Sequence, residues 1–126
     1  MDETNRLENS SPNGDHYLIN FFGCDQDQIN SVDFWKKVLP ESIEKSRMTA
    51  LKSYFYEFKP QGVTGFLLLS ASHISIHTWP EYGYVACDLF SCSGEEESKN
   101  VVDFLVKNIK NSRVEVQKIC RGYKYC

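Results

Sequence analysis

The sequence lacks several features that would place it in a membrane or nucleic-acid-binding class. Its longest apolar stretches, around residues 66–69 and 84–90, are far shorter than the roughly 20 residues that a membrane-spanning helix needs. Neither charge sign dominates, because 14 Lys and Arg residues are interspersed with 17 Asp and Glu residues and the formal net charge is -3. No basic stripe therefore favours a nucleic acid or an anionic membrane as partner.

The N-terminal residues lack the apolar core that a secretory signal needs, since Asn, Ser and Glu dominate them. A chain of this length suits one compact domain. We therefore expect a soluble, cytoplasmic protein in which residues 1–13 are a disordered lead-in and residues 14–126 form a single domain.

The cysteines lack the spacing of a metal site or a disulfide framework. There are five of them, an odd number, with no CxxC pair and no close grouping of Cys and His: Cys24, Cys87, Cys92, Cys120 and Cys126. We expect reduced thiols and no bound metal.

What the sequence does contain is a series of extended patterns punctuated by turn residues. These predict strands at residues 16–22, 50–58, 63–70, 72–79, 84–92 and 113–120. Lys59 to Gly62 fit a type I turn with Pro60 in second position, and residues 80–83 again have turn chemistry. In the strand at 63–70, apolar residues occupy both odd-numbered and even-numbered positions, which point to opposite faces of the sheet. This is expected of a strand that is covered on both faces or lies at an interface.

Two helices are predicted by apolar spacing and capping residues. Ser31 caps the first, whose apolar stripe Pro40 should end or kink before a second short stretch through Arg47. Ser93 and Glu96 fit a capping box that opens the second, with Ile109 closing its apolar face. The order of elements predicts an α+β fold, a two-layer sandwich of a mainly antiparallel sheet with two helices on one face.

The most informative residues form a set of short motifs, the longest of which lie in the middle of the chain. They are 62–65 (GVTG), 70–84 (SASHISIHTWPEYGY) and 88–92 (DLFSC), and upstream 14–16 (GDH) and 24–25 (CD). Together they resemble the bacterial and archaeal S-adenosylmethionine decarboxylases from about residue 14 to 122. A run that holds Trp, His and Pro in fixed order is a specific signal.

A decarboxylase needs an electron-poor carbonyl to hold the electron pair that remains when carbon dioxide leaves. A serine can become one if its hydroxyl attacks the preceding peptide carbonyl, forms an ester and then eliminates the upstream chain. The resemblance implies that Ser72 is this serine, that cleavage falls between Ala71 and Ser72, and that Ser72 becomes a pyruvoyl cofactor. Ser70 and Ser75 are the rival serines.

The same resemblance assigns three further catalytic residues. His77 matches the histidine that takes the proton driving ester formation and elimination, Thr64 replaces a hydroxyl residue that is usually serine, and Cys92 matches the cysteine that returns a proton to the substrate carbon. Cys87 alternates with core positions and is predicted to be structural. Strict alternation puts His77 on the face opposite Ser72, so either the backbone bends near Ser72 or the contact is not direct.

The binding residues follow in the same way. Phe58 and Trp79 match the aromatic pair that holds the adenine between its rings, and Glu81 matches the carboxylate that accepts the ribose hydroxyls. The resemblance implies S-adenosylmethionine as substrate, a homodimer of processed protomers, and a product that serves as the aminopropyl donor for spermidine synthesis.

Two departures from the family pattern leave alternatives open. The family normally has glutamate where this chain has Ala71, and Thr64 adds a methyl group to the expected hydroxyl. One alternative is a pyruvoyl-dependent decarboxylase of arginine or ornithine, as some relatives of the family are. The other, which Ala71 and Thr64 motivate, is a non-enzymatic paralogue that never cleaves. Phe58, Trp79 and Glu81 argue against the first, because a substrate without adenosine needs no stacking pair.

Overall fold

The computed structural model describes residues 12–123, so residues 1–11 of the predicted lead-in lie outside the described residues, as do residues 124–126. In chain order the elements are β1 (Asn13–Phe22), α2 (Gln26–Ile29), α3 (Val32–Ser42), β2 (Ala50–Glu57), β3 (Val63–Leu69), β4 (His73–Trp79), the 3₁₀ helix η2 (Pro80–Tyr82), β5 (Tyr84–Ser91), α4 (Glu95–Asn108) and β6 (Arg113–Gly122). The predicted order is confirmed, with the short helices α2 and η2 added.

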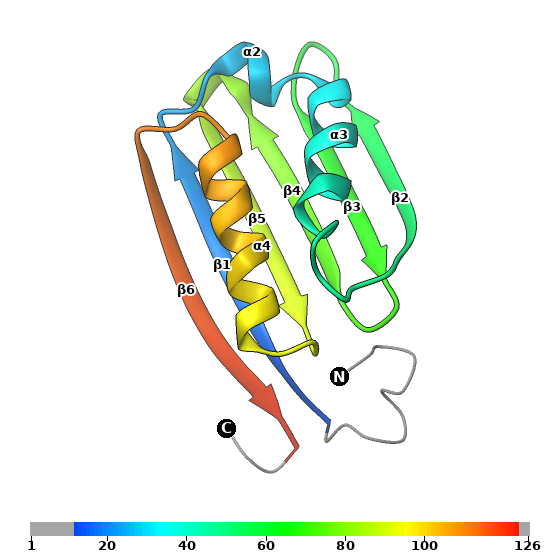
Figure 1. The fold of residues 1–126 in the computed structure, drawn as a ribbon. Helices are drawn as coiled ribbons and strands as arrows, with labels where there is room; N and C mark the ends of the chain where they lie inside the picture. The colour runs from blue at the N-terminus through cyan, green and yellow to red at the C-terminus, as the bar shows by residue number, and fades with distance from the viewer. Residues whose placement is uncertain (1–11, 124–126) are drawn as a thin grey trace.

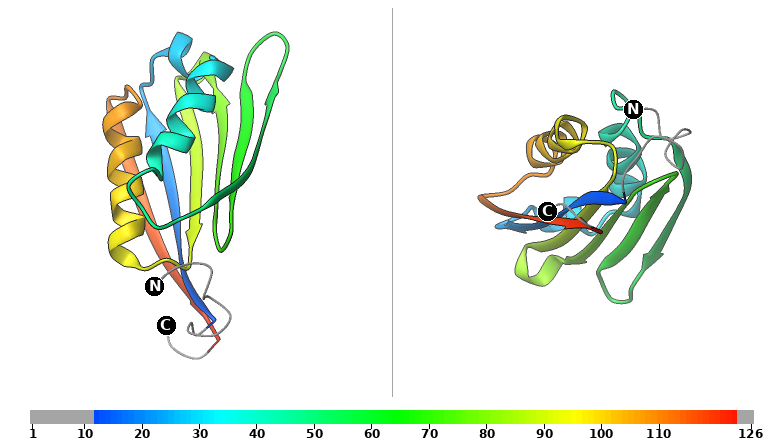
Figure 2. Two further views of the ribbon diagram at one scale, coloured as in Figure 1. Left: turned by 45° about the vertical axis from the view of Figure 1, so that its right-hand side comes forward. Right: turned by 90° about the horizontal axis from the view of Figure 1, so that it is seen from below.

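The six strands form one antiparallel sheet in the order β2-β3-β4-β5-β1-β6. The N-terminal strand β1 lies between β5 and β6, so it pairs with two strands that come much later in the chain. Helices α3 and α4 pack on one face of the sheet (Figures 1 and 2). We call the opposite face, which no described helix covers, the outer face. The predicted two-layer α+β sandwich is confirmed.

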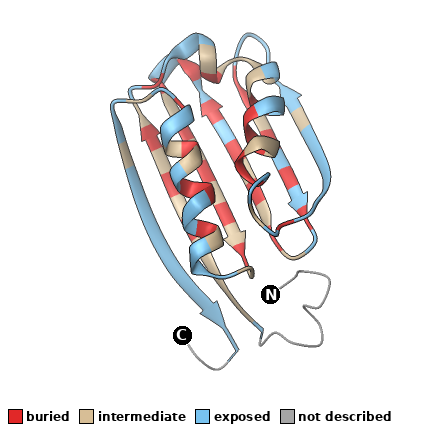
Figure 3. Cartoon of the chain, in the orientation of Figure 1, coloured by how far each residue is buried: buried red, intermediate tan, exposed pale blue. Residues whose placement is uncertain are grey.

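The hydrophobic core lies between the sheet and the two helices, because alternate side chains of each inner strand point toward the helices. Figure 3 shows buried residues alternating with less buried ones along these strands. On β4, Ile74 and Ile76 are fully buried, whereas His77 is exposed on the outer face. Trp35 of α3 is fully buried and its indole Nε1–H donates to the Ile29 carbonyl at 3.0 Å, which satisfies its polar atom inside the core.

The first helix begins as the sequence predicts, and the second does not. The Ser31 hydroxyl accepts a hydrogen bond from the Phe34 backbone N–H at 3.1 Å, an N-cap contact. The N-cap of α4 is Gly94, with a φ of 101° and no side-chain cap bond, so the predicted capping box at Ser93 is wrong. The Ser93 backbone N–H instead donates to the Ser91 hydroxyl at 3.1 Å.

Pro40 neither ends nor breaks α3 before Ser42, so the predicted broken helix is wrong. Pro40 lies in the last turn, where only one intrahelical hydrogen bond is lost by its missing N–H. After it the backbone tightens, with the Ile43 N–H donating to the Pro40 carbonyl at 3.3 Å. Residues 43–47 then form turns and no second helical stretch.

The turn between β2 and β3 also differs from its prediction. The hairpin is present, but the Phe58 N–H donates to the Gly62 carbonyl at 2.8 Å, which makes the loop wider than a type I turn. The Gly62 N–H, which would close such a turn, donates instead to the Asn30 side chain at 2.8 Å. The Lys59–Pro60 peptide bond is cis.

Strand β3 is covered on one face only. Leu67 and Leu69 are buried, whereas Phe66 and Leu68 on the outer face are 39% and 41% exposed. The interpretation of β3 as a strand covered on both faces is therefore wrong for this chain. Its place at an interface stays a prediction. Within the described range, no helix combines the length and apolar character needed to cross a membrane.

Candidate active site

Two of the predicted catalytic residues form a pair on the outer face. Thr64 of β3 and His77 of β4 are register partners, and the Thr64 hydroxyl and His77 Nδ1 lie 3.0 Å apart within hydrogen-bond distance. Because both side chains project from neighbouring inner strands, the sheet itself fixes their separation. The pair can therefore pass a proton between a hydroxyl and an imidazole.

The other two predicted catalytic residues meet at the opposite end of β4. Ser72 lies in the bend between β3 and β4, one residue before β4 begins, and is only 6% exposed. Cys92 follows the end of β5, and its backbone N–H donates to the Ser72 hydroxyl at 3.4 Å. The bend is closed by the Leu69 N–H, which donates to the Ser72 carbonyl at 2.9 Å.

Within one chain these two pairs lie apart. His77 is five residues beyond Ser72, which corresponds to about 16 Å along a strand. Ser72 is buried while His77 is exposed on the outer face. The backbone does bend near Ser72, but the bend does not bring the two residues together. Of the two possibilities that the sequence left open, the structure of one chain agrees with the one in which Ser72 and His77 have no direct contact.

The predicted binding residues lie around the Thr64–His77 pair. A pocket of about 380 Å³ at this end of the sheet is lined by Phe58, Thr64, His77, Trp79 and Glu81, together with Lys59, Gln61, Gly62 and Thr78. Trp79 also stacks on Tyr84, with ring centroids 5.4 Å apart. Phe58 packs edge-on against Tyr56 at 4.7 Å. The pocket thus offers two aromatic rings, a carboxylate and a proton-transfer pair.

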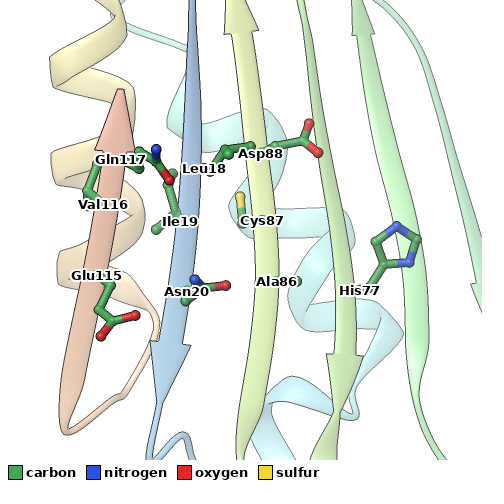
Figure 4. Close-up of a pocket in the computed structure, with 10 residues that line it drawn as sticks. All are labelled: Leu18, Ile19, Asn20, His77, Ala86, Cys87, Asp88, Glu115, Val116 and Gln117. Carbon is green, nitrogen blue, oxygen red and sulfur yellow. The ribbon is translucent and has the colours of Figure 1, made fainter. Parts of the chain in front are cut away.

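A second hollow, of about 360 Å³, lies across β6, β1, β5 and β4 (Figure 4). His77 lines both this hollow and the first pocket. The other polar residues that line the second hollow include Asn20, Asp88 and Glu115. Because two of these carry carboxylates, the second hollow is more acidic than the first pocket.

The cysteines divide into core and surface residues. Burial, and then the nearby charge of Asp88, raise the pKa of the Cys87 thiol, which supports the prediction that Cys87 is structural. Burial also raises the pKa of Cys24 to about 11. Cys92 is half-buried. Cys120 is disulfide-bonded, so the expectation of reduced thiols throughout is wrong for Cys120.

The structure also brings together three residues that sequence reasoning did not join. His16, His73 and Asp88 meet on the outer face, with donor atoms within 4.8 Å of one another. In the sequence they are separated by 57 and 15 positions, as the numbers 16, 73 and 88 give. Only the strand order and register, which pair Phe90 with both histidines, could have revealed the group.

The fold gives the class of protein first. A solved structure of the adenosylmethionine decarboxylase from Aquifex aeolicus superposes with a TM-score of 0.84 at 31% sequence identity, and the match covers 92% of this chain and 96% of that one. The chain therefore has the fold of an adenosylmethionine decarboxylase.

Sequence comparison then gives the family. The family model described as S-adenosylmethionine decarboxylase matches residues 15–122. A proenzyme of that name from Sulfurihydrogenibium sp. is 38% identical over 109 residues, covering 86% of this chain and 82% of the relative. The Pyrococcus abyssi proenzyme is 36% identical over 109 residues, covering 86% and 78%. The chain belongs to the S-adenosylmethionine decarboxylase family.

Proposed function

We propose that the chain is a self-processing S-adenosylmethionine decarboxylase, with a pyruvoyl group made from Ser72, that produces the aminopropyl donor for spermidine synthesis. The contact between Ser72 and Cys92 is the observation that carries this proposal. This backbone contact supports the proposal, because the residue predicted to donate the proton adjoins the residue to which the substrate's amino group would be attached. Relatives named as proenzymes support self-processing.

Self-cleavage begins with attack of the Ser72 hydroxyl oxygen on the Ala71 carbonyl carbon. The amide bond breaks as an ester forms, and the freed amine of residue 72 takes up the hydroxyl proton. Removal of the Ser72 Cα proton then expels the upstream chain as a carboxylate and leaves dehydroalanine. Tautomerisation and addition of water release ammonia, so residues 72–126 begin with a pyruvoyl group. Ala71 takes part only through its carbonyl, so its side chain does not prevent cleavage.

The pyruvoyl carbonyl supplies the electron sink for the carbon that loses carbon dioxide. Phe58 and Trp79 hold the adenine, and each stacked ring contributes about 0.5–1.5 kcal/mol beyond its buried area. Glu81, at the rim of the same pocket, accepts hydrogen bonds from the ribose hydroxyls. Cys92 then returns a proton to the substrate carbon.

A second copy of the chain completes this site. His77 and the pocket lie about 16 Å along β4 from Ser72, so one chain cannot bring its own histidine to its own serine. A two-fold axis that sets the outer faces of two sheets together would place the Thr64–His77 pair of one protomer against Ser72 and Cys92 of its partner.

The apolar surface of the outer face supports the same arrangement. Near β2 and β3 it carries large side chains that are exposed in the single chain: Tyr54, Tyr56, Phe66 and Leu68. An uncovered apolar patch on one face of a sheet is typical of a protein interface. We therefore propose a homodimer in which each active site takes residues from both protomers.

The function is tested by the intact mass of the purified protein under denaturing conditions. We expect two species that break between Ala71 and Ser72, the downstream one with a blocked pyruvoyl end, and a single uncut chain for Ser72→Ala. Incubation with S-adenosylmethionine should then release carbon dioxide. An uncut wild-type chain would contradict self-processing and indicate the non-enzymatic paralogue. Release from arginine or ornithine, and not from S-adenosylmethionine, would contradict the substrate.

A further inference from the structure

Three side chains with metal-ligating atoms converge on the outer face, apart from the residues assigned to self-cleavage and substrate binding. They are His16 of β1, His73 of β4 and Asp88 of β5. Strand β5 lies between the other two, so the group spans three neighbouring strands. In Figure 4 the Asp88 carboxylate extends from β5 toward β4, the strand that carries His73.

The separations of the donor atoms suit a small metal ion. His16 Nε2 and His73 Nε2 lie 3.7 and 3.5 Å from the same oxygen, Asp88 Oδ1. Donors of a tetrahedral ion with bonds of about 2.0–2.1 Å lie about 3.4 Å from one another. The two distances to Asp88 Oδ1 are therefore close to those of a metal site and longer than those of good hydrogen bonds, and the two histidine donors lie within 4.8 Å of each other.

Two of these donor atoms are buried, and a buried polar atom normally has a hydrogen-bond partner. His16 Nε2 and Asp88 Oδ1 are shielded from solvent, and neither has a hydrogen-bond partner within the described part of the chain. An unpaired buried carboxylate oxygen is costly, and a buried polar atom without a partner requires an explanation. A cation bound between the two atoms would satisfy both.

We propose that His16, His73 and Asp88 bind one divalent transition-metal ion of the Zn²⁺ class. Two imidazoles and one carboxylate are a donor set that Zn²⁺ accepts. Mg²⁺ and Ca²⁺ prefer oxygen donors and more of them, so they do not fit this group. Because each ligand projects from a strand of the sheet, the ion would tie β1, β4 and β5 together.

One neighbouring charge opposes the cation and limits its affinity. The Arg121 guanidinium lies over the Phe90 ring, 5.1 Å from its centroid, and Phe90 packs against both histidines. The Asp88 carboxylate is the one charge within the group that favours binding. The site is therefore expected to bind Zn²⁺ more weakly than a site with several anionic ligands.

The experiment is a calorimetric titration of the purified, EDTA-treated protein, with both of its self-cleavage fragments present, with Zn²⁺ at pH 7.5. We expect one ion per chain, undisturbed by excess Mg²⁺. His16→Gln, His73→Gln and Asp88→Asn should each weaken binding by more than the roughly 10–100-fold that loss of an outer-shell partner costs. Asp103→Asn is the matched control for Asp88→Asn, because it removes an exposed carboxylate of α4 outside the group, and it should bind Zn²⁺ as the wild type does.

Cysteine is the competing ligand and needs its own control. Cys92→Ser should leave Zn²⁺ binding unchanged. Zn²⁺ should also raise the melting temperature of the wild type and not that of Asp88→Asn, since a ligand of the folded state stabilises it. Loss of binding in Cys92→Ser, or unchanged binding in the three ligand variants, would overturn the proposal.

A measurement on the wild type keeps the proposal testable if a ligand variant fails to fold. Co²⁺ bound by two imidazoles and a carboxylate should give visible d–d absorption without a thiolate-to-cobalt charge-transfer band. A charge-transfer band, or no binding of Co²⁺ and Zn²⁺, would overturn it.

Discussion

At the scale of single residues, Cys92 separates the two reactions of the proposed mechanism. It lies beside Ser72 and donates its backbone N–H to the serine hydroxyl. Cys92→Ala keeps that N–H, so it should leave self-cleavage intact and lose most decarboxylation. Mass spectrometry of the chain and carbon dioxide release measure the two effects separately. Decarboxylation at the wild-type rate would show that another group protonates the substrate carbon.

The thiols should also differ in their reactivity. Cys24 has a pKa of about 11 in the folded chain and the pKa of Cys87 is raised further, so both stay protonated at pH 8. At that pH a thiol of pKa 11 is roughly 0.1% thiolate, the form that reacts with iodoacetamide. We expect peptide mapping after brief native labelling to find Cys92 modified and Cys24 and Cys87 unmodified.

Peptide mapping of the labelled thiols also provides a control for this prediction and an outcome that would contradict it. Labelling in denaturant should modify Cys24 and Cys87 as readily as Cys92, because unfolding removes the burial that raises their pKa. Rapid native labelling of Cys87 would show that the core around β5 is open in solution.

At the scale of elements, α3 depends on its N-terminal cap. The Ser31 hydroxyl accepts the Phe34 N–H, and Ser31→Ala removes that acceptor. We expect a loss of about 0.5–2 kcal/mol in the free energy of unfolding, measured by urea denaturation. Ser31→Asp keeps an acceptor at the same position and should restore most of the stability. An equal loss in both variants would mean that the hydroxyl acts through other contacts.

The helix ends also show which local signals the sequence could carry. Ser31 caps α3 because its hydroxyl and the first turn are close in sequence. The similar pattern at Ser93 failed, because the Ser93 backbone N–H bonds to Ser91 and the helix begins one residue later, after Gly94 at positive φ. Capping residues therefore predicted that a helix starts here, but not which residue caps it.

At the scale of the whole molecule, the proposed dimer makes a prediction that one chain cannot satisfy. Ser72→Ala chains retain His77, and His77→Ala chains retain Ser72, so neither should cleave alone. Co-expression should yield mixed dimers in which the histidine of one chain acts on the serine of the other. Mass spectrometry of differently tagged chains should then find cleavage of the His77→Ala chain.

A second mixture is the control for this test. Ser72 and Cys92 meet within one chain, so mixing Ser72→Ala with Cys92→Ala should restore no decarboxylation. Absence of cleavage in the first mixture, with mixed dimers verified by pull-down, would contradict a site shared between protomers.

The sequence by itself determined the order of the six strands and the two longer helices, the apolar face of those helices, and membership of the family. These follow from local alternation, from turn and capping residues, and from the continuous motif at residues 70–84. It left open whether a bend near Ser72 brings this residue to His77, because the position of the bend depends on how β3 and β4 pair. It also could not join His16 to His73 and Asp88. That meeting required β1 to insert beside β5, and pairing between strands distant in the chain is decided by the packing of the whole sheet.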